Sequence, residues 1–578
     1  MSHTPNYDSK VKAILDKLVP GERTDRLTSE KWTMTDEEIS WYKKFNVPPA
    51  TVSIPTRWKQ QGSWFVGYQF WYQTHPETGK PIVGTIHPAT GLKMLPDVEW
   101  FTKDFLDKGI DYDPSAPFFP QFRALQLTVS APAGRNHIEP KNSIAVVSQG
   151  DEDSYFVCAC RSKRTYYAHV ALDVEDSAEV FSGNNIQNSF NVVHSSRIFN
   201  CQFVRESRDC LNSTFLFDCR NCEFCYGASN KRNKKYLWWN EQLSKEEWER
   251  RRAEVDLGSR KDMDSERAKF QAFIRDFSVW PENFNENVTD STGEYLTKTT
   301  NVRESYLCEG GADLFGCNFS YGDAKDNAFV GYPVWSTNSY YSCSAGRSNS
   351  IKFCHLSVQS NDLEYCSFCY NCENCFGCVG LNRKKFCIFN KQYEEAEYYR
   401  RVDELKCAML DRGEYGEFFP TAFSPSYYRD ASCIHWFGGT DDEMKKIGVN
   451  DFDPESMGAI GQDLTAAADL HQVNELPDHI KDLGQEWIGK PMFDALTNRR
   501  FAIIGPEVEL YKRQQIAPPQ KHAMGRMRDL WTEANMGSFE DAGCAKCGKA
   551  LRVAKNMGHK DRRIFCREDY LKFLETNG

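Results

Sequence analysis

The sequence lacks the long apolar segment that a membrane span requires. No apolar run among its 578 residues approaches the roughly 20 residues that cross a bilayer. The opening residues, MSHTPNYDSKVKAILDKL, also lack the uninterrupted apolar core of a secretory signal. These absences predict a cytoplasmic protein that does not contact a membrane. In a reducing compartment its cysteines are expected to be thiols or metal ligands rather than disulfides.

Common catalytic motifs are missing as well. We find no glycine-rich phosphate loop, no H-E-x-x-H pair and no G-x-S-x-G elbow. His194, His355 and His435 stand isolated, which is typical of structural histidines rather than of catalytic bases. The acidic runs 151–153 and 441–443 have the composition of solvated turns. The sequence therefore indicates no reaction, and a non-enzymatic role is favoured.

Cysteine and aromatic residues are abundant instead. The chain has 22 Cys, 14 Trp, 26 Tyr and 38 Phe, and it is long enough to bury a core without disulfide staples. Its net charge of -10 argues against binding a polyanion over the whole surface. Residues 484–578 have the opposite sign, with 17 Lys and Arg against 12 Asp and Glu.

The two ends of the chain are similar to each other at an offset of 469 residues. The aligned identities are Leu27/Leu496, Thr28/Thr497, Glu38/Glu507, Tyr42/Tyr511, Lys43/Lys512, Pro49/Pro518 and Arg57/Arg526. In each copy a short helix, at 36–45 and 506–514, is predicted to end before prolines that cannot continue it. We interpret both ends, 1–120 and 485–578, as small α+β modules of zinc-finger type.

The C-terminal copy contains a candidate zinc site. Cys544 and Cys547 form a C-x2-C pair, and Cys566 follows at a distance typical of the second half of a zinc site. Asp569, at the fourth position of a second C-x2-C, or His559 in the intervening loop would complete the ligands. Zinc accepts carboxylate or imidazole beside thiolates, so one structural zinc is predicted.

The N-terminal copy lacks these ligands. His75, Thr78 and Asp97 stand at the positions of the three cysteines. A neutral hydroxyl cannot supply the charge of a thiolate, so this module is expected to fold without metal around its many aromatic residues.

Basic residues are densest in the C-terminal module. The candidate phosphate-binding side chains are Lys546, Lys549, Arg552, Lys555, Arg562 and Arg563. Such a cluster is typical of RNA or ribosome association that is sequence-independent and sensitive to salt. A solvated surface without a ligand is the alternative interpretation.

The middle of the chain contains a second duplication. Cys219, Cys222 and Cys225 align with the run 372–378 at an offset of 153. Short alternating segments recur with cysteines nine residues apart, which predicts β-solenoid blocks over 121–257 and 258–437, with nine residues as half a rung. Helices at 244–255, 265–277 and 394–410 are expected to cap them. Residues 438–484 have the composition of an acidic, small-residue linker.

Five cysteines at intervals of three allow two interpretations of the second block. They are Cys366, Cys369, Cys372, Cys375 and Cys378. An iron–sulfur cluster uses a similar spacing, but the Cys-Pro end of the ferredoxin motif is absent. Because cysteine is also a small apolar filler, stacked structural thiols are favoured and the cluster stays open.

Three motifs carry a resemblance to a known family. The segments CENCFGCVGLNRKKFCIFNKQYEEAEY, EEISWYKKFNVPP and CAKCGK…FCREDY resemble those of an uncharacterised cysteine-rich repeat protein family of candidate-phyla (ultra-small) bacteria. The resemblance implies central repeats flanked by zinc-finger-like modules and brings no established activity. Members typically carry fuller C-x2-C pairs in both modules, whereas here the N-terminal set is lost and the C-terminal set is one cysteine short.

The combined expectation is a mainly β fold with α-helices, in which two β-solenoid blocks lie between the terminal modules. The favoured function is a non-enzymatic scaffold that binds a protein partner or itself. An RNA- or ribosome-associated factor is the alternative. A carbohydrate-active β-solenoid enzyme is the remote alternative.

Overall fold

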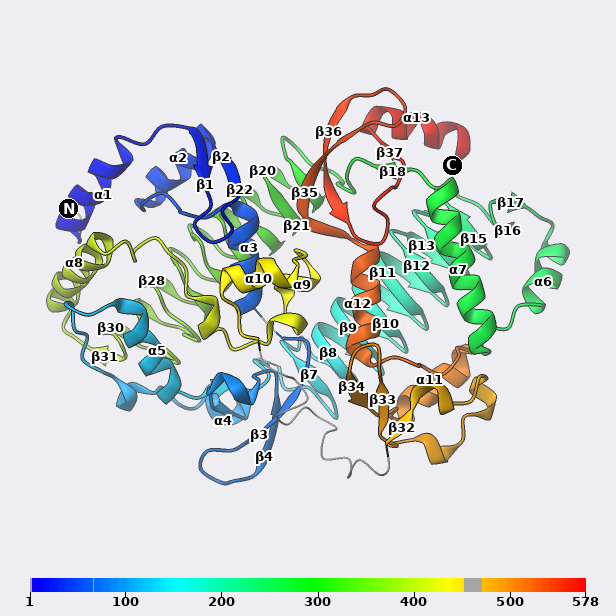
Figure 1. Cartoon of the computed structure of the whole chain (residues 1–578), viewed down its shortest axis with the longest axis horizontal. Coiled ribbons are helices and arrows are strands. Elements are labelled where there is room, and N and C mark those ends of the chain that lie inside the picture. Colours follow the sequence, from blue (N-terminus) through cyan, green and yellow to red (C-terminus); the bar gives the residue numbers. More distant parts are fainter. Residues whose placement is uncertain (1–2, 66, 137, 452–469) are drawn as a thin grey trace.

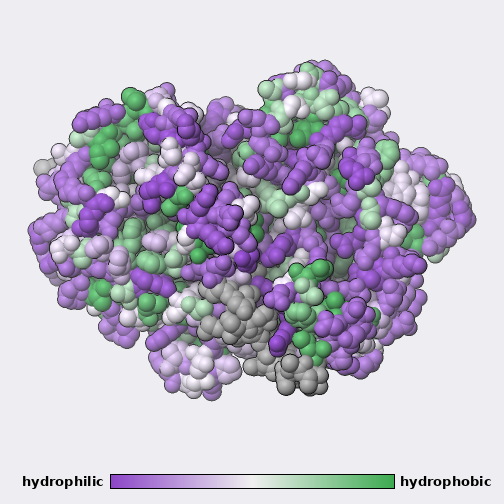
Figure 2. All heavy atoms as spheres, in the orientation of Figure 1, coloured by the Kyte–Doolittle hydropathy of each residue, from purple (hydrophilic) through white to green (hydrophobic). Residues whose placement is uncertain are grey.

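The computed structural model describes residues 3–65, 67–136, 138–451 and 470–578, and shows a mixed α/β fold rich in short strands (Figure 1). No described helix has the length and apolar character needed to cross a membrane. Polar and charged residues cover most of the face shown in Figure 2, with apolar residues in scattered groups.

The N-terminal module consists of short helices and two-stranded sheets. Its elements are α1 (Pro5–Leu15), β1 (Gly21–Thr24), β2 (Lys31–Met34), α2 (Asp36–Phe45), α3 (Ile54–Trp64), β3 (Trp71–Thr74), β4 (Pro81–Gly84), β5 (Met94–Leu95), α4 (Asp97–Trp100), α5 (Phe118–Thr128) and β6 (Ala131–Pro132). Because β6 pairs with β5, this module extends past the predicted boundary at residue 120.

The C-terminal module repeats the order of elements from β1 to α4, preceded by the extra strand β32. Its elements are β32 (His471–Gln472), β33 (Met492–Asp494), β34 (Arg499–Phe501), α11 (Gly505–Gln514), α12 (Ala523–Glu533), β35 (Asn535–Gly543), β36 (Ala550–Asn556), β37 (Ile564–Phe565) and α13 (Arg567–Asn577). Adding 469 to the bounds of α2 and α3 gives the bounds of α11 and α12. The offset found in the sequence therefore also relates the helices.

The first block is a stack of parallel strands. Its elements are β7 (Ile144–Val146), β8 (Tyr155–Lys163), β9 (Tyr166–Glu175), β10 (Ala178–Gln187), β11 (Phe190–Phe199), β12 (Gln202–Arg205), β13 (Arg208–Leu211), β14 (Thr214–Phe217), β15 (Tyr226–Ser229), β16 (Leu237–Trp238), β17 (Glu241–Gln242), α6 (Lys245–Ala253) and α7 (Arg260–Phe277). Most parallel neighbours are twelve residues apart, as in Val180↔Val192. The antiparallel pair β16–β17 ends the stack before α6.

The second block repeats this arrangement. Its elements are β18 (Trp280–Pro281), β19 (Gly293–Thr297), β20 (Thr300–Arg303), β21 (Ser305–Glu309), β22 (Ala312–Phe315), β23 (Asn318–Tyr321), β24 (Lys325–Ala328), β25 (Gly331–Val334), β26 (Cys343–Gly346), β27 (His355–Val358), β28 (Asn361–Glu364), β29 (Glu373–Phe376), β30 (Lys385–Ile388), β31 (Lys391–Gln392) and α8 (Glu395–Asp411). Neighbours such as Cys375↔Cys387 are again twelve apart. The pair β30–β31 again precedes a helix.

The register corrects the spacing inferred from the cysteines. One step of either stack takes twelve residues, so a nine-residue interval is three quarters of a step rather than half a rung. In the first block every third side chain is buried, from Ser177 through Ile186, Val192 and Cys201 to Cys210. The residue before each buried position commonly has a positive φ, as Asn188, Asn191 and Asn200 do. Asparagine tolerates this conformation better than most residues, which favours such sharp corners.

Serine and cysteine recur at the buried positions, where both make the same kinds of hydrogen bond. The thiol of Cys201 donates to the carbonyl of Phe199 at 3.3 Å, while its amide donates to the hydroxyl of Ser189 at 3.1 Å. The amide of Cys366 donates to the sulfur of Cys354 at 3.5 Å. Small side chains that both donate and accept therefore join successive steps inside a narrow core.

Helices α3 and α12 of the terminal modules pack on the blocks that are distant in sequence, while strands β35, β36 and β37 of the C-terminal module also contact β21, β19 and β18 of the second block. Figure 1 places the N-terminal module beside the second block and the C-terminal module beside the first. The α3 helix contacts β25 and β26, whereas α12 contacts β10 and β11. Aromatic residues from modules and blocks form one large cluster, separate from the two narrow interiors.

The predicted helices are present and the predicted linker is partly folded. Helices α6, α7 and α8 cover the predicted ranges. Within 438–484, α10 (Asp441–Ile447) begins with a capping box at Thr440 and buries Met444 and Ile447, and α9 (Ser432–His435) precedes it. Residues 452–469 of this segment lie outside the described residues.

Candidate metal centre

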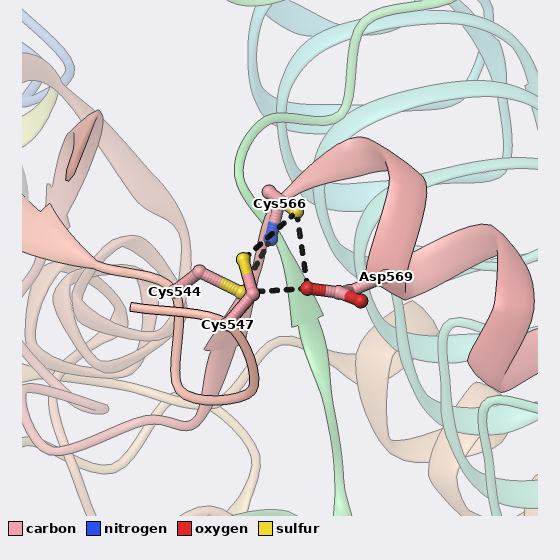
Figure 3. A group of neighbouring side chains, drawn as sticks. All are labelled: Cys544, Cys547, Cys566 and Asp569. Carbon is pink, nitrogen blue, oxygen red and sulfur yellow. Dashed lines mark hydrogen bonds between the residues drawn. The ribbon is translucent and has the colours of Figure 1, made fainter. Parts of the chain in front are cut away.

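Four predicted ligands from two chain segments meet at the tip of the C-terminal module (Figure 3). Cys544 directly follows β35, and Cys547 lies in the turn that leads to β36. Cys566 is the N-cap residue of α13, and Asp569 lies in the first turn of that helix. The β-hairpin turn and the helix start thus place three thiols and a carboxylate together.

The distances within this group are short. The thiols of Cys544 and Cys566 each lie 3.3 Å from Oδ2 of Asp569. The sulfur atoms of Cys547 and Cys566 are 3.8 Å apart. One ligand atom from each of the four residues lies within 4.8 Å of every other, and among the described residues no other such group of three or more occurs.

These distances fit a tetrahedral zinc ion. With Zn–S bonds of about 2.3 Å, two sulfur atoms of a tetrahedron lie about 3.8 Å apart. The Cys547–Cys566 separation matches that value. Three thiolates and one carboxylate would hold the ion and leave no open position for a substrate, so zinc here would hold the two segments together.

Backbone amides favour the thiolate form of Cys544. Burial raises the pKa of Cys544, but hydrogen bonds from the amides of Cys566, Cys547 and Lys546 outweigh it and lower that pKa. Hydrogen bonds from the thiols of Cys547 and Cys544 lower the pKa of Asp569 to about 2. Amides aimed at a sulfur favour the thiolate, the form that binds metal.

His559, the other candidate for the fourth ligand, lies outside this group. Its ring packs against Trp280, with 5.3 Å between the ring centroids. Burial lowers the pKa of His559. The sequence could not separate His559 from Asp569, because the choice depends on where α13 begins relative to the hairpin.

The N-terminal module builds the same turn without thiols. The amide of His75 donates to the carbonyl of Lys80, as Cys544 does to Lys549, both at 2.8 Å. Nδ1 of His75 accepts the amide of Thr78 at 3.2 Å, and its Nε2 lies 2.8 Å from a carboxylate oxygen of Glu99. An imidazole thus takes the place of a sulfur as the acceptor at the centre of the turn.

The other two N-terminal equivalents have different partners. Asp97 accepts backbone amides of Gly134 and Asn136 at 3.0 Å each. Trp100, which corresponds to Asp569, is fully buried and donates to the carbonyl of Ser130 at 2.7 Å. Asp97 is thus held by the backbone that follows β6, and Trp100 also packs against Tyr370 of the second block, with 5.4 Å between the ring centroids.

The helix that carries two of the candidate ligands is fixed to the end of the first block. Tyr570 is buried and donates its hydroxyl to Asp218, a carboxylate that is itself 1% exposed. Arg232 donates to the same tyrosine hydroxyl at 3.2 Å. Lys231 donates to the carbonyl of Asn577 at the last turn of α13. The candidate metal centre thus lies beside a joint between module and block.

A buried polar network accounts for three of the identities between the two ends. In the N-terminal module Arg57 donates to Glu38 at 2.6 Å and to the hydroxyl of Tyr42 at 2.8 Å. The equivalent Arg526 donates to Glu507 at 3.2 Å and to Tyr511 at 2.7 Å.

Both arginines also face an aromatic ring of a block. Arg57 lies 3.9 Å from the ring centroid of Phe329, and Arg526 lies 4.4 Å from that of Tyr167. The aligned identities showed that these positions correspond, but only the fold shows that they form the seats on which the modules dock.

The predicted phosphate-binding residues differ in accessibility. The five exposed side chains are Lys546, Lys549, Arg552, Lys555 and Arg563. Arg562 is not available: it is 9% exposed, packs over Trp280 and donates to the carbonyl of His559 at 3.2 Å. Its aromatic partner lies almost 300 residues earlier, so no local sequence pattern indicates this burial.

The run Cys366–Cys378 occupies successive buried positions of the second block. Its first four cysteines lie at consecutive inward positions, and Cys378 follows Cys366 by twelve residues, which is one step of the register. The thiol of Cys366 donates to the carbonyls of Glu364 at 3.5 Å and Cys375 at 3.4 Å.

The isolated histidines are also enclosed. Burial lowers the pKa of His194 to about 3 and that of His355 and His435 well below the usual value.

The comparisons with known proteins identify no family. No protein-family model matches the chain, and no curated protein matches it. One solved structure, titled a "putative acetyltransferase" from Desulfovibrio desulfuricans G20, shares 10% identity with a TM-score of 0.10, covering 45% of this chain and 68% of that chain. A likeness that weak carries no argument about fold or function, and the family resemblance stays a prediction.

Proposed function

We propose that the protein is a non-enzymatic scaffold built on two β-solenoid blocks, with one structural zinc ion in the C-terminal module. The observation that carries the proposal is the closed set of four donors beside the joint with the first block. A catalytic zinc keeps a position open for water or substrate, whereas a structural zinc is fully ligated by protein.

The interior of the blocks supports a structural role. Serine hydroxyls and cysteine thiols of one step bond to the backbone of the next, as Ser342 does when it accepts the amide of Cys354 at 3.0 Å. Burial raises the pKa of Cys317 and Cys201 to about 12, so these thiols stay protonated at neutral pH. Stacked steps of this kind give a long, rigid body whose outer surface is free to bind a protein partner or a second copy.

Metal analysis of the full chain tests the zinc site. The reduced protein should contain one zinc per chain, and Cys547→Ser should lose most of it. Cys407→Ser is the matched control, because Cys407 is partly accessible on α8 and lies outside the donor group. Absence of zinc from the natural protein, or equal loss in both variants, would contradict the proposal.

Purification from the native host tests the scaffold. We expect a stoichiometric protein partner, or a defined homo-oligomer, that persists at high salt and cross-links to residues of the blocks. Turnover of a substrate by the isolated chain would instead support an enzyme.

RNA or ribosome association is the second candidate function. It is favoured by the five exposed basic side chains of the C-terminal module. Affinity for single-stranded RNA should fall steeply between about 50 and 200 mM salt, because binding releases counterions. Lys549→Glu combined with Lys555→Glu should weaken binding at every salt concentration. Affinity that ignores salt and both substitutions would exclude this function.

A further inference from the structure

One cysteine of this chain is exposed, whereas the others are partly or fully enclosed. Of the 22 thiols, Cys547 alone is exposed, Cys407 is intermediate and the rest are buried. Cys547 precedes Gly548, whose backbone has a φ of +76° and open space on the side where a Cβ would lie. Cys547 is therefore the thiol of the protein that a small soluble oxidant reaches most readily.

A partner for this thiol lies directly beside it. The sulfur of Cys566 is 3.8 Å from that of Cys547, and Cys566 itself is 4% exposed. A disulfide bond is about 2.05 Å long, so a modest rotation in the open turn brings the two sulfur atoms to bonding distance. The exposed thiol and the enclosed thiol thus form a pair suited to attack and resolution.

We propose that Cys547 and Cys566 are a site of reversible oxidation by peroxides, at which disulfide formation expels the zinc ion. This inference rests on the proposed zinc site. It adds a modification to that site and names the co-reactant as a hydroperoxide.

The chemistry balances in two steps. The Cys547 thiolate attacks one oxygen of hydrogen peroxide, the O–O bond breaks, and hydroxide leaves to give a sulfenic acid. The Cys566 thiolate then attacks that sulfur, the S–S bond forms, and a second hydroxide leaves. With two protons taken up, peroxide is reduced to two waters while two thiolates lose two electrons. A small thiol reverses the change by exchange and is itself oxidised to its disulfide.

Loss of two donors releases the metal and loosens α13. Cys544 and Asp569 alone cannot complete a tetrahedral zinc site. The start of α13 is then no longer held to the hairpin, which weakens the contact of Tyr570 with Asp218 on the first block. Oxidation at the tip of the module would thus be transmitted to the joint with the first block.

The test uses the full chain with zinc bound and hydrogen peroxide as the probe. We expect release of one equivalent of zinc to a chromogenic chelator, a mass decrease of about 2 Da, and a mapped Cys547–Cys566 disulfide. Hydrogen exchange should rise in 566–577, and a thiol reductant with added zinc should restore all readings.

Two variants test whether zinc release depends on the thiol of Cys547. Cys547→Asp keeps an oxygen donor for zinc and removes the attacking thiol, so its zinc should resist peroxide; Cys407→Ser should respond like the natural protein. Zinc that stays bound under peroxide, or a disulfide that joins other cysteines, overturns this inference and leaves the zinc site intact. Absence of zinc from the reduced protein overturns the zinc site itself.

Discussion

The two terminal modules share a frame and differ at its tip. In both, a buried Glu, Tyr and Arg lock two helices together and seat them on an aromatic ring of a block. At the tip, one module gathers three thiols and a carboxylate, whereas the other holds the same turn with His75. The comparison shows that a module can keep the docking network without the candidate metal centre.

The modules also differ in how they contact the block that is nearer to them in sequence. The N-terminal module places Tyr68 on His169 of the first block, with 4.3 Å between the ring centroids. The C-terminal module donates from Asn535 to Glu294 of the second block at 3.1 Å. The first of these two crossings is a stack of rings, and the second combines a hydrogen bond to a buried carboxyl with the pairing of β37 and β18.

Zinc removal should produce the largest difference in hydrogen exchange between the two modules. A chelator under reducing conditions should raise hydrogen exchange across β36, β37 and α13 and leave β3, β4 and α4 unchanged. The effect should be large, because structural zinc contributes about 10–16 kcal/mol in isolated zinc-finger peptides. Equal protection in both modules after chelation would refute the asymmetry.

Loss of either docking arginine should be the next largest effect. Arg57→Met or Arg526→Met leaves a buried carboxylate without its partner, which costs about 3–5 kcal/mol. The cost should be greater for Arg526, because it pairs with both Glu507 at 3.2 Å and Glu179 at 2.8 Å.

Chemical denaturation, monitored by hydrogen exchange, measures this loss of stability in each module. The double variant Glu38→Leu/Arg57→Met should recover much of the loss, because no unpaired charge remains. A double variant as unstable as the single one would show that the network acts through packing rather than charge.

The two crossings should respond to pH in opposite directions. Burial raises the pKa of Glu294 from 4.5 to about 7, so its contribution to stability is full below pH 4.5 and is lost as pH rises towards 7. Burial lowers the pKa of His169 from 6.5 to about 3, so its contribution is full above pH 6.5 and is lost as pH falls towards 3.

A single substitution separates these two contributions. Glu294→Gln should raise the free energy of unfolding at pH 8 by about 3 kcal/mol and change little at pH 4. Unfolding curves at both pH values check this. A gain of equal size at both would assign the effect to packing.

Helix capping should give the smallest difference. The hydroxyl of Thr35 accepts the amide of Glu38 at 3.1 Å at the start of α2, whereas the equivalent Ile504 gives α11 no side-chain cap. Thr35→Ala should cost about 1 kcal/mol. Ile504→Ala is the matched control. It removes no capping hydrogen bond from α11, so any loss of stability in this variant comes from packing alone. Loss of protection in the first turn of α2 only in Thr35→Ala would support this reading.

Local patterns predicted the helices and the candidate donors well. The prolines after residues 45 and 514 and the serine at position 244 placed helix ends within a few residues, because those signals act within one turn. The C-x2-C spacing identified Cys544 and Cys547, because a hairpin turn must hold two ligands of one ion. The step of twelve was missed because cysteines at intervals of three and nine fit several step lengths equally well.

Local sequence signals predicted helices α2, α6, α7, α8 and α11, the correspondence of the two ends at an offset of 469, and the thiols that are close along the chain. Those properties depend on neighbours a few residues away. The tertiary structure was needed to show that Asp569 rather than His559 joins the thiols, that Arg562 is enclosed by Trp280, and that α3 and α12 dock on the distant blocks. Burial and proximity are set by residues up to hundreds of positions apart, and no local pattern encodes which of them meet.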